Sequence, residues 1–247
     1  MSRRFILDLA GGHIATAIKV TRDEDLWPAF NSLGLQVSSP VLVVVGGASK
    51  LGEDDFARLK SLFECVLAPM AQALNMIVID GGTDAGVMKL IGQARSNIGG
   101  TFPLLGVAPV GLADFPNTPF ELANDPCALE PHHTHFILVP GSDWGNESPW
   151  IAKIATALAK DKPSIAILAN GGEITWKDAQ QNVDAHRPVI VVEGSGRTAD
   201  VLAHALDGEI IDDRAKALID SQLLRSIDMA EDFQSISQTL YQILETH

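Results

Sequence analysis

Glycine-rich turns follow several short apolar runs of this chain, and they hold the residues best suited to chemistry. The segments that contain them are 43–52, 78–88, 138–147, 168–173 and 191–200. Glycine has no Cβ, so its N–H group can approach an anion closely, and a helix that begins after the turn adds partial positive charge. Several such turns at one edge of a sheet predict a pocket for a phosphate-bearing, nucleotide-like small molecule.

These turns and their neighbours supply the candidate ligand-binding residues. Thr83 adds a hydroxyl, and Arg197 adds a guanidinium whose planar fork suits a phosphate group. The alternative role of Arg197 is a surface ion pair with Asp200. Trp144 could stack on a base or merely close the core. The full set is Gly46, Gly47, Gly81, Gly82, Thr83, Gly86, Gly141, Trp144, Glu147, Gly171, Gly172, Gly194, Ser195, Gly196 and Arg197.

Catalytic groups are less evident than binding groups. Glu147, Asp80 and Asp84 lie at expected strand ends, where a carboxyl could act as general acid or base. Asp84 also suits a helix cap. The sequence contains no G-x-x-x-x-G-K-[ST] or G-x-G-x-x-G motif, no nucleophile elbow and no H-E-x-x-H motif. We therefore expect no nicotinamide cofactor, and whether the chain is an enzyme stays open.

A histidine cluster, His132, His133 and His135, invites comparison with a metal site. Positions 133 and 135 of a strand share one face, as two ligands would. Zinc usually takes three or four ligands, however, and no third has a supporting spacing. We favour histidines that enter a strand, with one of them hydrogen-bonded in the pocket wall, and we expect neither a metal nor a required cofactor.

The composition indicates a folded, acidic protein. The 247 residues are 46% hydrophobic and 20% charged, and the formal net charge is -13. Such a surface repels nucleic acid and anionic membranes, because both are bound through Lys and Arg. No apolar run approaches the ~18 residues of a membrane span, and the start of the chain is too weak for a signal peptide. We expect a cytoplasmic protein in which Cys65 belongs to the core.

Apolar runs alternate with helical patterns along most of the chain. The runs 41–45, 76–80, 104–109, 135–140, 165–170 and 189–194 are typical of strands covered on both faces. Residues 13–20 could form a strand or hairpin arm. The alternation predicts an α/β fold, a Rossmann-like, doubly wound and mostly parallel sheet flanked by helices.

The expected helices have recognisable ends. One covers 54–74 with Phe56 in its apolar stripe, and Pro69 should kink or divide it. Another runs from Pro149 to about Lys160, with Ser148 as N-cap.

The C-terminal part, 213–247, predicts one or two amphipathic helices. Their buried stripe would contain Phe233, Ile236, Leu240, Ile243 and Leu244. They could mediate a homo-oligomer. No linker interrupts 1–247, which favours a single domain.

Five ordered segments resemble conserved blocks of the SLOG superfamily, which includes the LOG, Smf-DprA and TRPM types. The resemblance covers roughly 40–205 and is greatest to prokaryotic soluble relatives of the N-terminal SLOG domain of TRPM channels. It implies a Rossmann-like fold and recognition of a nucleotide derivative such as ADP-ribose. The segments are GGTDAGVMKLIGQA (81–94), LLGVAPVG (104–111), HHTHFILVPG (132–141), LANGGE (168–173) and PVIVVEGSGRTADVLA (188–203).

The resemblance also implies roles for individual positions. Thr83 with its glycines and Arg197 match ligand-binding blocks, and Trp144-Gly145-x-Glu147 is similar to an aromatic-Gly-x-Glu segment that lines the channel pocket. Ile151 stands where some channels carry a ligand-contacting arginine. The superfamily's phosphoribohydrolases share a block similar to 81–88, whereas their P-G-G-x-G-T-x-x-E block is only partly matched.

Three functions follow from this reading. The leading hypothesis is a domain that binds or senses a nucleotide-derived small molecule. The second is a nucleotide-processing hydrolase of the N-glycosidase type, in which Glu147, Asp80 or Asp84 polarises the leaving group or activates water. The third is a protein-interaction module with a vestigial pocket.

Overall fold

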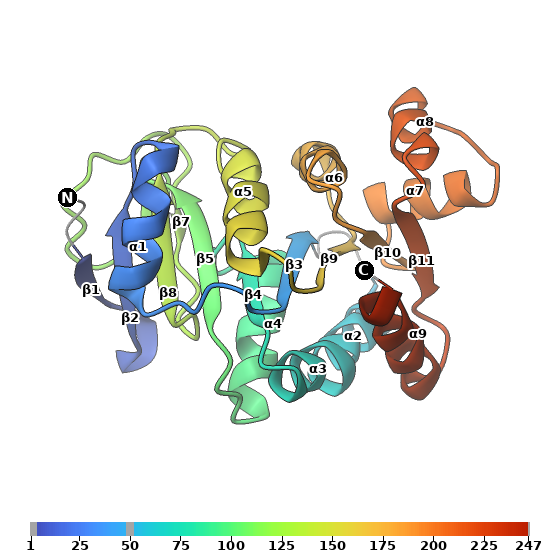
Figure 1. Ribbon diagram of the computed structural model, residues 1–247, viewed down its shortest axis with the longest axis horizontal. Helices are drawn as coiled ribbons and strands as arrows, with labels where there is room; N and C mark the ends of the chain where they lie inside the picture. Colours follow the sequence, from blue (N-terminus) through green and yellow to red (C-terminus); the bar gives the residue numbers. More distant parts are fainter. Residues whose placement is uncertain (1–3, 48–51, 247) are drawn as a thin grey trace.

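A nine-stranded sheet runs through the computed structural model, which describes residues 4–47 and 52–246 (Figure 1). Its strand order is β1-β2-β8-β5-β4-β3-β9-β10-β11, and every neighbouring pair is parallel except β1 with β2. The strands are β1 (Arg4–Asp8), β2 (Ile14–Lys19), β3 (Val41–Gly46), β4 (Ile77–Asp80), β5 (Leu104–Pro109), β8 (His135–Val139), β9 (Ser164–Ala169), β10 (Val189–Glu193) and β11 (Leu224–Asp228). The predicted doubly wound, mostly parallel sheet is confirmed. A small separate sheet pairs β6 (Ala113–Asp114) with β7 (Cys127–Ala128).

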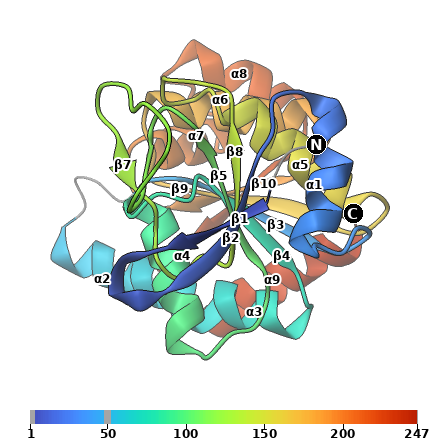
Figure 2. The same cartoon turned by 90° about the vertical axis from the view of Figure 1, so that its left-hand side faces the viewer.

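Helices cover both faces of the large sheet, as the end-on view in Figure 2 shows. One layer consists of α1 (Leu26–Leu33), α5 (Ser148–Ala159), α6 (Glu173–Asp184), α7 (Thr198–Leu206) and α8 (Asp213–Asp220). The other consists of α2 (Glu53–Leu62), α3 (Ala68–Ala73), α4 (Gly86–Asn97) and α9 (Phe233–Thr246). Short 3-10 turns lie at Ala10–Gly12 and Asp23–Asp25. No helix in the described ranges is long and apolar enough to cross a membrane.

The strand order reverses beside β3. The chain leaves β3 through β4, β5 and β8 in one direction, then returns to pair β9 with the other side of β3. The two strands approach closely where β3 ends. Gly46 has a φ of 124°, and a Cβ at this position would overlap the carbonyl oxygen of Ala169. Only glycine therefore allows β3 to end against β9, at the kind of crevice where open α/β sheets bind ligands.

The predicted strands agree with the structure to within a residue or two at their ends. The uncertain segment 13–20 forms β2, which is the inner arm of a hairpin with β1 and pairs in parallel with β8. Residues 48–51 of the first glycine-rich segment lie outside the described residues.

The prediction that 213–247 is wholly helical is wrong. Between α8 and α9 the chain forms β11, which pairs in parallel with β10. In this edge strand Leu224 and Ile227 are buried, whereas Arg225 and Ser226 are exposed. It therefore lacks the continuous apolar run that marks the central strands.

The helix expected over 54–74 is divided, as Pro69 suggested. A π-helical turn, Phe63–Leu67, separates α2 from α3, and Pro69 lies in the first turn of α3. Proline has no N–H to donate within a helix, and its ring crowds the carbonyl four residues earlier. The wider π-helical turn lies where this α-helical hydrogen bond is missing. Cys65 lies in this turn and is exposed, so its predicted place in the core is wrong. Phe56, in the first turn of α2, is 41% exposed rather than part of a buried stripe.

Gly92 provides a test of how α4 packs on the molecule. Helix propensity alone would make Gly92→Ala stabilising by about 1 kcal/mol. A Cβ at this position, however, would overlap the buried carboxylate of Glu130. We expect Gly92→Ala to lower the free energy of unfolding by about 1–3 kcal/mol, measured by urea denaturation.

The matched background is Glu130→Ala, which removes the overlapping carboxylate. In that background Gly92→Ala should be neutral or stabilising. If Gly92→Ala lowers the free energy of unfolding equally in both backgrounds, the contact between α4 and Glu130 does not cause the destabilisation.

Candidate ligand-binding site

A cavity of about 500 Å³ opens at the carboxyl edge of the sheet, next to the reversal of strand order. This volume lies in the range of small-molecule sites. The wall comes from the ends of β3, β4 and β9, the starts of α4, α5 and α6, and the segment before β7. The lining residues are Val44, Val45, Gly46, Gly47, Gly81, Thr83, Ala85, Met88, Asp125, Pro126, Cys127, Trp144, Glu147, Ile151, Gly172, Glu173, Ile174, Thr175, Asp178 and Arg197.

The cavity brings together about half of the candidate ligand-binding residues. Those in its wall are Gly46, Gly47, Gly81, Thr83, Trp144, Glu147, Gly172 and Arg197. The others, Gly82, Gly86, Gly141, Gly171, Gly194, Ser195 and Gly196, shape the turns without lining this cavity. Of the three candidate catalytic carboxyls, only Glu147 reaches it.

Ser195 illustrates how a residue of the right type can lie beneath the site rather than in it. It is fully buried. Its hydroxyl donates to the carbonyl of Val192 and accepts the N–H of Asn170 at 2.8 Å. The adjoining turn is held by Asp200, whose Oδ1 accepts the N–H groups of Gly194 and Gly196 at 2.9 and 3.0 Å. These contacts fix the backbone from which the next residue, Arg197, extends.

Arg197 itself lies in the cavity wall. Its φ is 57°, a value that non-glycine residues rarely adopt. Its guanidinium covers Gly172, where a Cβ would lie 2.9 Å from Nη2. A side chain at position 172 would therefore displace the guanidinium, so the LANGGE turn and Arg197 depend on each other.

The loop that carries Trp144 is anchored on both sides. The Gly145 N–H donates to the Glu147 carboxylate at 2.8 Å, and Lys177 of α6 donates to the Gly145 carbonyl. Asn146 Oδ1 accepts the N–H groups of Ser142 and Asp143. The N-cap prediction for α5 is one residue late, because the helix begins at Ser148 and Glu147 occupies the cap position.

Two carboxyls, Glu147 and Asp178, share the wall of the cavity. Burial raises the pKa of Glu147. Burial and the neighbouring charge of Glu147 raise the pKa of Asp178 to about 7. Sequence reasoning missed Asp178, which stands in the middle of a polar helix. The available signal was its spacing from Ile174. Residues four apart lie on the same face of a helix, and α6 begins directly after a glycine turn.

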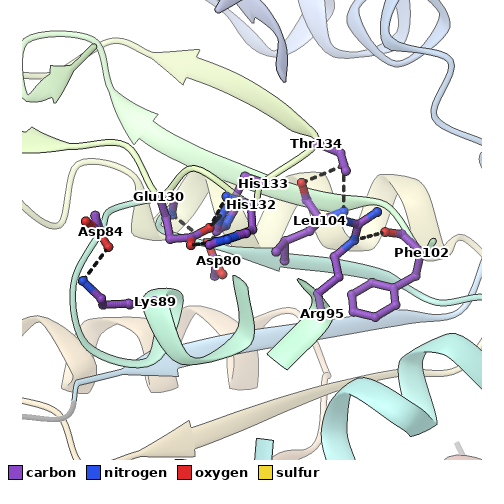
Figure 3. Close-up of polar contacts among 11 residues, drawn as sticks. Asp80, Asp84, Lys89, Arg95, Phe102, Leu104, Glu130, His132, His133 and Thr134 are labelled. Atoms are coloured by element: carbon purple, nitrogen blue, oxygen red, sulfur yellow. Dashed lines mark hydrogen bonds and ion pairs between the residues drawn. The ribbon is translucent and has the colours of Figure 1, made fainter. Parts of the chain in front are cut away.

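Asp80 belongs to a largely buried hydrogen-bonded chain of side chains, none of which lines the cavity (Figure 3). Its Oδ1 accepts the Gly82 N–H at 2.7 Å and lies 2.8 Å from His133 Nε2. His133 Nδ1 lies 2.8 Å from Glu130 Oε2, and His132 Nδ1 lies 2.6 Å from Glu130 Oε1. The expected hydrogen bonding of the histidines is confirmed. None of His132, His133 and His135 lines the cavity, however, so the expected place of one histidine in the pocket wall is wrong. Asp80 fixes the 81–83 turn rather than facing the cavity.

The two carboxylates of this hydrogen-bonded network, Asp80 and Glu130, determine the charge of His133. Burial acts against a charged His133, but Asp80 and Glu130 outweigh it and raise the pKa of His133 to about 9. Asp84, the third candidate catalytic residue, forms an ion pair with Lys89 at 3.0 Å (Figure 3). Neither Asp80 nor Asp84 lines the cavity.

The family model described as "SLOG in TRPM, prokaryote" matches residues 39–237. The chain belongs to this family. Similar curated proteins include transient receptor potential cation channel subfamily M member 2 of Mus musculus, which is 28% identical over 204 aligned positions; the alignment covers 69% of this chain and 13% of the channel. The member-like 2 channel of Nematostella vectensis is 26% identical over 230 aligned positions, with coverage of 78% of this chain and 14% of the channel. Channel trpm of Drosophila melanogaster is 27% identical over 227 aligned positions, with coverage of 76% of this chain and 11% of the channel.

This SLOG domain therefore spans little more than a tenth of the length of these relatives. The match extends past the five glycine-rich turns to residue 237, so it includes β11 and the start of α9.

The buried histidine makes stability depend on pH in the alkaline range. The pKa of His133 is about 9 in the fold and 6.5 as the reference value. Protonated His133 therefore stabilises the fold fully below about pH 6.5, and this contribution is lost as the pH rises through 9. We expect the free energy of unfolding to fall on the order of 2 kcal/mol between about pH 7 and 9.5 in urea titrations. His133→Gln should make the free energy of unfolding depend less on pH in this range. If the pH dependence is unchanged in the variant, another group is responsible for it.

Asp178 gives a second, lower pH window. Its pKa is about 7 in the fold against a reference value of 3.8. Protonated Asp178 therefore contributes fully to stability below about pH 3.8, and this contribution is lost as the pH rises through 7. Asp178→Asn removes the buried charge and should stabilise the domain. The gain should be on the order of 2 kcal/mol larger at about pH 8 than at pH 4.5 in urea titrations.

The matched control is Asp184→Asn at the exposed end of the same helix. It removes a carboxyl that does not line the cavity, so it separates the effect of position 178 from that of a change in net charge. An Asp178→Asn variant that gains nothing at the higher pH would contradict the burial of a charge in the cavity wall.

Proposed function

We propose that this SLOG domain binds and senses a nucleotide-derived small molecule that carries phosphate, such as ADP-ribose or a relative of it. The observation that carries the proposal is the place of the cavity. It lies beyond the carboxyl ends of the strands at the reversal of strand order, and glycine turns from β3, β4 and β9 form its floor. Nucleotides bind at this place in open α/β sheets.

One part of the wall suits phosphate. The cavity meets α4 at Ala85 and α6 at Gly172 and Glu173, so two helix N-termini contribute partial positive charge. Arg197 adds a full positive charge beside Gly172. These groups let an acidic protein hold an anion locally.

The rest of the wall suits a nucleoside. Trp144, Met88 and Ile174 offer apolar surface against which a flat base could stack. Glu147 and Asp178 offer carboxyl oxygens to sugar hydroxyls or exocyclic amines. A pocket that combines apolar surface with a few convergent polar groups is typical of a specific ligand site.

The same carboxyls support hydrolysis as a second candidate function. Burial raises the pKa of both carboxyls, and with a pKa of about 7 Asp178 can hold a proton near neutral pH and donate it to a leaving base. Glu147 and Asp178 would then act on an N-glycosidic bond.

The proposal is tested by calorimetric titration with ADP-ribose, cyclic ADP-ribose, NAD and AMP. Arg197→Ala should weaken binding of the tightest of these at least about tenfold, because a charge-assisted hydrogen bond contributes ~1.5–3 kcal/mol. The control, Arg225→Ala, removes an exposed arginine of β11 and should leave the affinity unchanged. Unchanged affinity in Arg197→Ala would exclude this pocket.

Product analysis of each bound compound separates the two functions. Binding without products supports a sensor. Release of free base that is abolished by Glu147→Gln supports the hydrolase. The absence of any binding would reject the nucleotide proposal and favour the interaction module.

A further inference from the structure

Arg187 is a buried arginine at the amino edge of the sheet, between the starts of β9 and β10. It is 3% exposed. Its N–H groups donate to Ser164 Oγ at 2.6 Å, Asn182 Oδ1 at 2.7 Å and Thr156 Oγ1 at 3.0 Å, with a longer contact of 3.4 Å to the Ala152 carbonyl. All of these acceptors are neutral. Among the described residues, Arg187 forms no ion pair.

The charge of Arg187 persists at neutral pH. Burial lowers its pKa to about 10. Neutral acceptors satisfy the N–H groups, but they leave the charge itself uncompensated. Buried charges in proteins are usually paired, because an isolated one costs several kcal/mol.

A pocket of about 180 Å³ lies beside Arg187. Its ionisable lining residues are all basic, in a chain where acidic residues outnumber Lys and Arg by 31 to 18. The lining residues are Thr156, Ala159, Lys160, Lys162, Ser164, Ala185, His186, Arg187 and Pro188.

Ser164 adds a hydrogen-bond donor to this pocket. Its hydroxyl accepts the Nε–H of Arg187. Within 4–47 and 52–246, the hydroxyl hydrogen itself is donated to no other group. The side chain can therefore accept from the guanidinium and donate to an anion at the same time.

Capping of the neighbouring helices does not account for the basic side chains. Helices α5 and α6 end here, and helix C-termini attract cations. Their last carbonyls, however, already accept main-chain N–H groups, including those donated by Lys160, Lys162, Ala185, His186 and Arg187. Among the described residues, the side chains of Lys160, Lys162 and His186 donate to none of these carbonyls.

Two acids near the pocket have partners of their own. Asp161 accepts the hydroxyl of Ser38, and Asp184 accepts the side-chain amide of Gln180 at 2.7 Å. The hydrogen bond from Ser38 and, to a smaller extent, the charges of Lys162 and Lys160 lower the pKa of Asp161, so this acid offsets part of the positive charge. The buried guanidinium lies outside that balance, because no carboxylate of the described ranges 4–47 and 52–246 contacts it.

We propose that Lys160, Lys162, Ser164 and Arg187 form a second site, which binds a small phosphate-containing anion. Arg187 and Ser164 hold the anion from the buried side, and the two lysines neutralise it from the solvent side. Lys and Arg in combination with a hydroxyl are typical ligands of phosphate. The site lies at the amino edge of the sheet, whereas the large cavity lies at the carboxyl edge.

Titration of the ¹⁵N-labelled domain with inorganic phosphate at constant ionic strength tests this site. Resonances of Lys162, Ser164 and Arg187 should shift with saturation. The Kd from these shifts should rise at least about tenfold in Lys160→Ala/Lys162→Ala, and Ser164→Ala should also raise it. Both variants leave the hydrogen bonds of Arg187 to α5 and α6 in place. A control at an exposed lysine of α8, Lys216→Ala, should leave the Kd unchanged.

The large cavity is monitored in the same spectra. Arg197→Ala should not alter the shifts at the amino edge. A parallel titration with glycerol 3-phosphate separates the two sources of the group: tighter binding than inorganic phosphate identifies a phosphorylated metabolite, and weaker binding identifies the free ion.

Three results would overturn the proposal. One is the absence of shifts at Lys162, Ser164 and Arg187 up to about 10 mM phosphate. Another is an unchanged Kd in the double-lysine variant. The third is a response confined to Gly172 and Arg197, which would assign phosphate to the large cavity alone.

Discussion

The close approach of β3 to β9 is the contact on which the rest of the structure depends. It exists because Gly46 ends β3 against the Ala169 carbonyl with no side chain between them. It lies where the strand order reverses, next to the cavity at this edge. The glycine turns after β3 and β9 both line that cavity, and Arg197 reaches it over Gly172. A side chain at the end of β3 would force the backbone of β3 or β9 to shift at this point.

Much of the fold could be predicted from the sequence because central parallel strands are covered on both faces. Runs such as 41–45 and 104–109 have no polar side chains to confuse the pattern. The edge strand β11 could not be found in this way, since solvent covers Arg225 and Ser226. The exposure of Cys65 depends on a π-helical turn, which hydrophobic periodicity does not indicate.

The residues of the candidate site could be predicted only where they lie in the turn directly after a strand. Thr83, Gly172 and Arg197 lie in such turns, after β4, β9 and β10. Asp178 lies within α6, and its raised pKa depends on burial and on the charge of Glu147 at the start of α5. The pairing of Asp80 with His133 joins positions far apart in sequence, so no local motif reveals it. The contact forms because the fold brings the end of β4 next to the segment before β8.

The hydrogen-bonded chain from Glu130 through His133 and Asp80 ends on the Gly82 N–H, so it fixes the turn that presents Thr83. A ligand would meet this turn already in its final conformation, and little conformational entropy would be lost at that part of the interface on binding. In kinetic terms, association there would need no slow rearrangement, and affinity differences among related ligands would arise mainly in their dissociation rates.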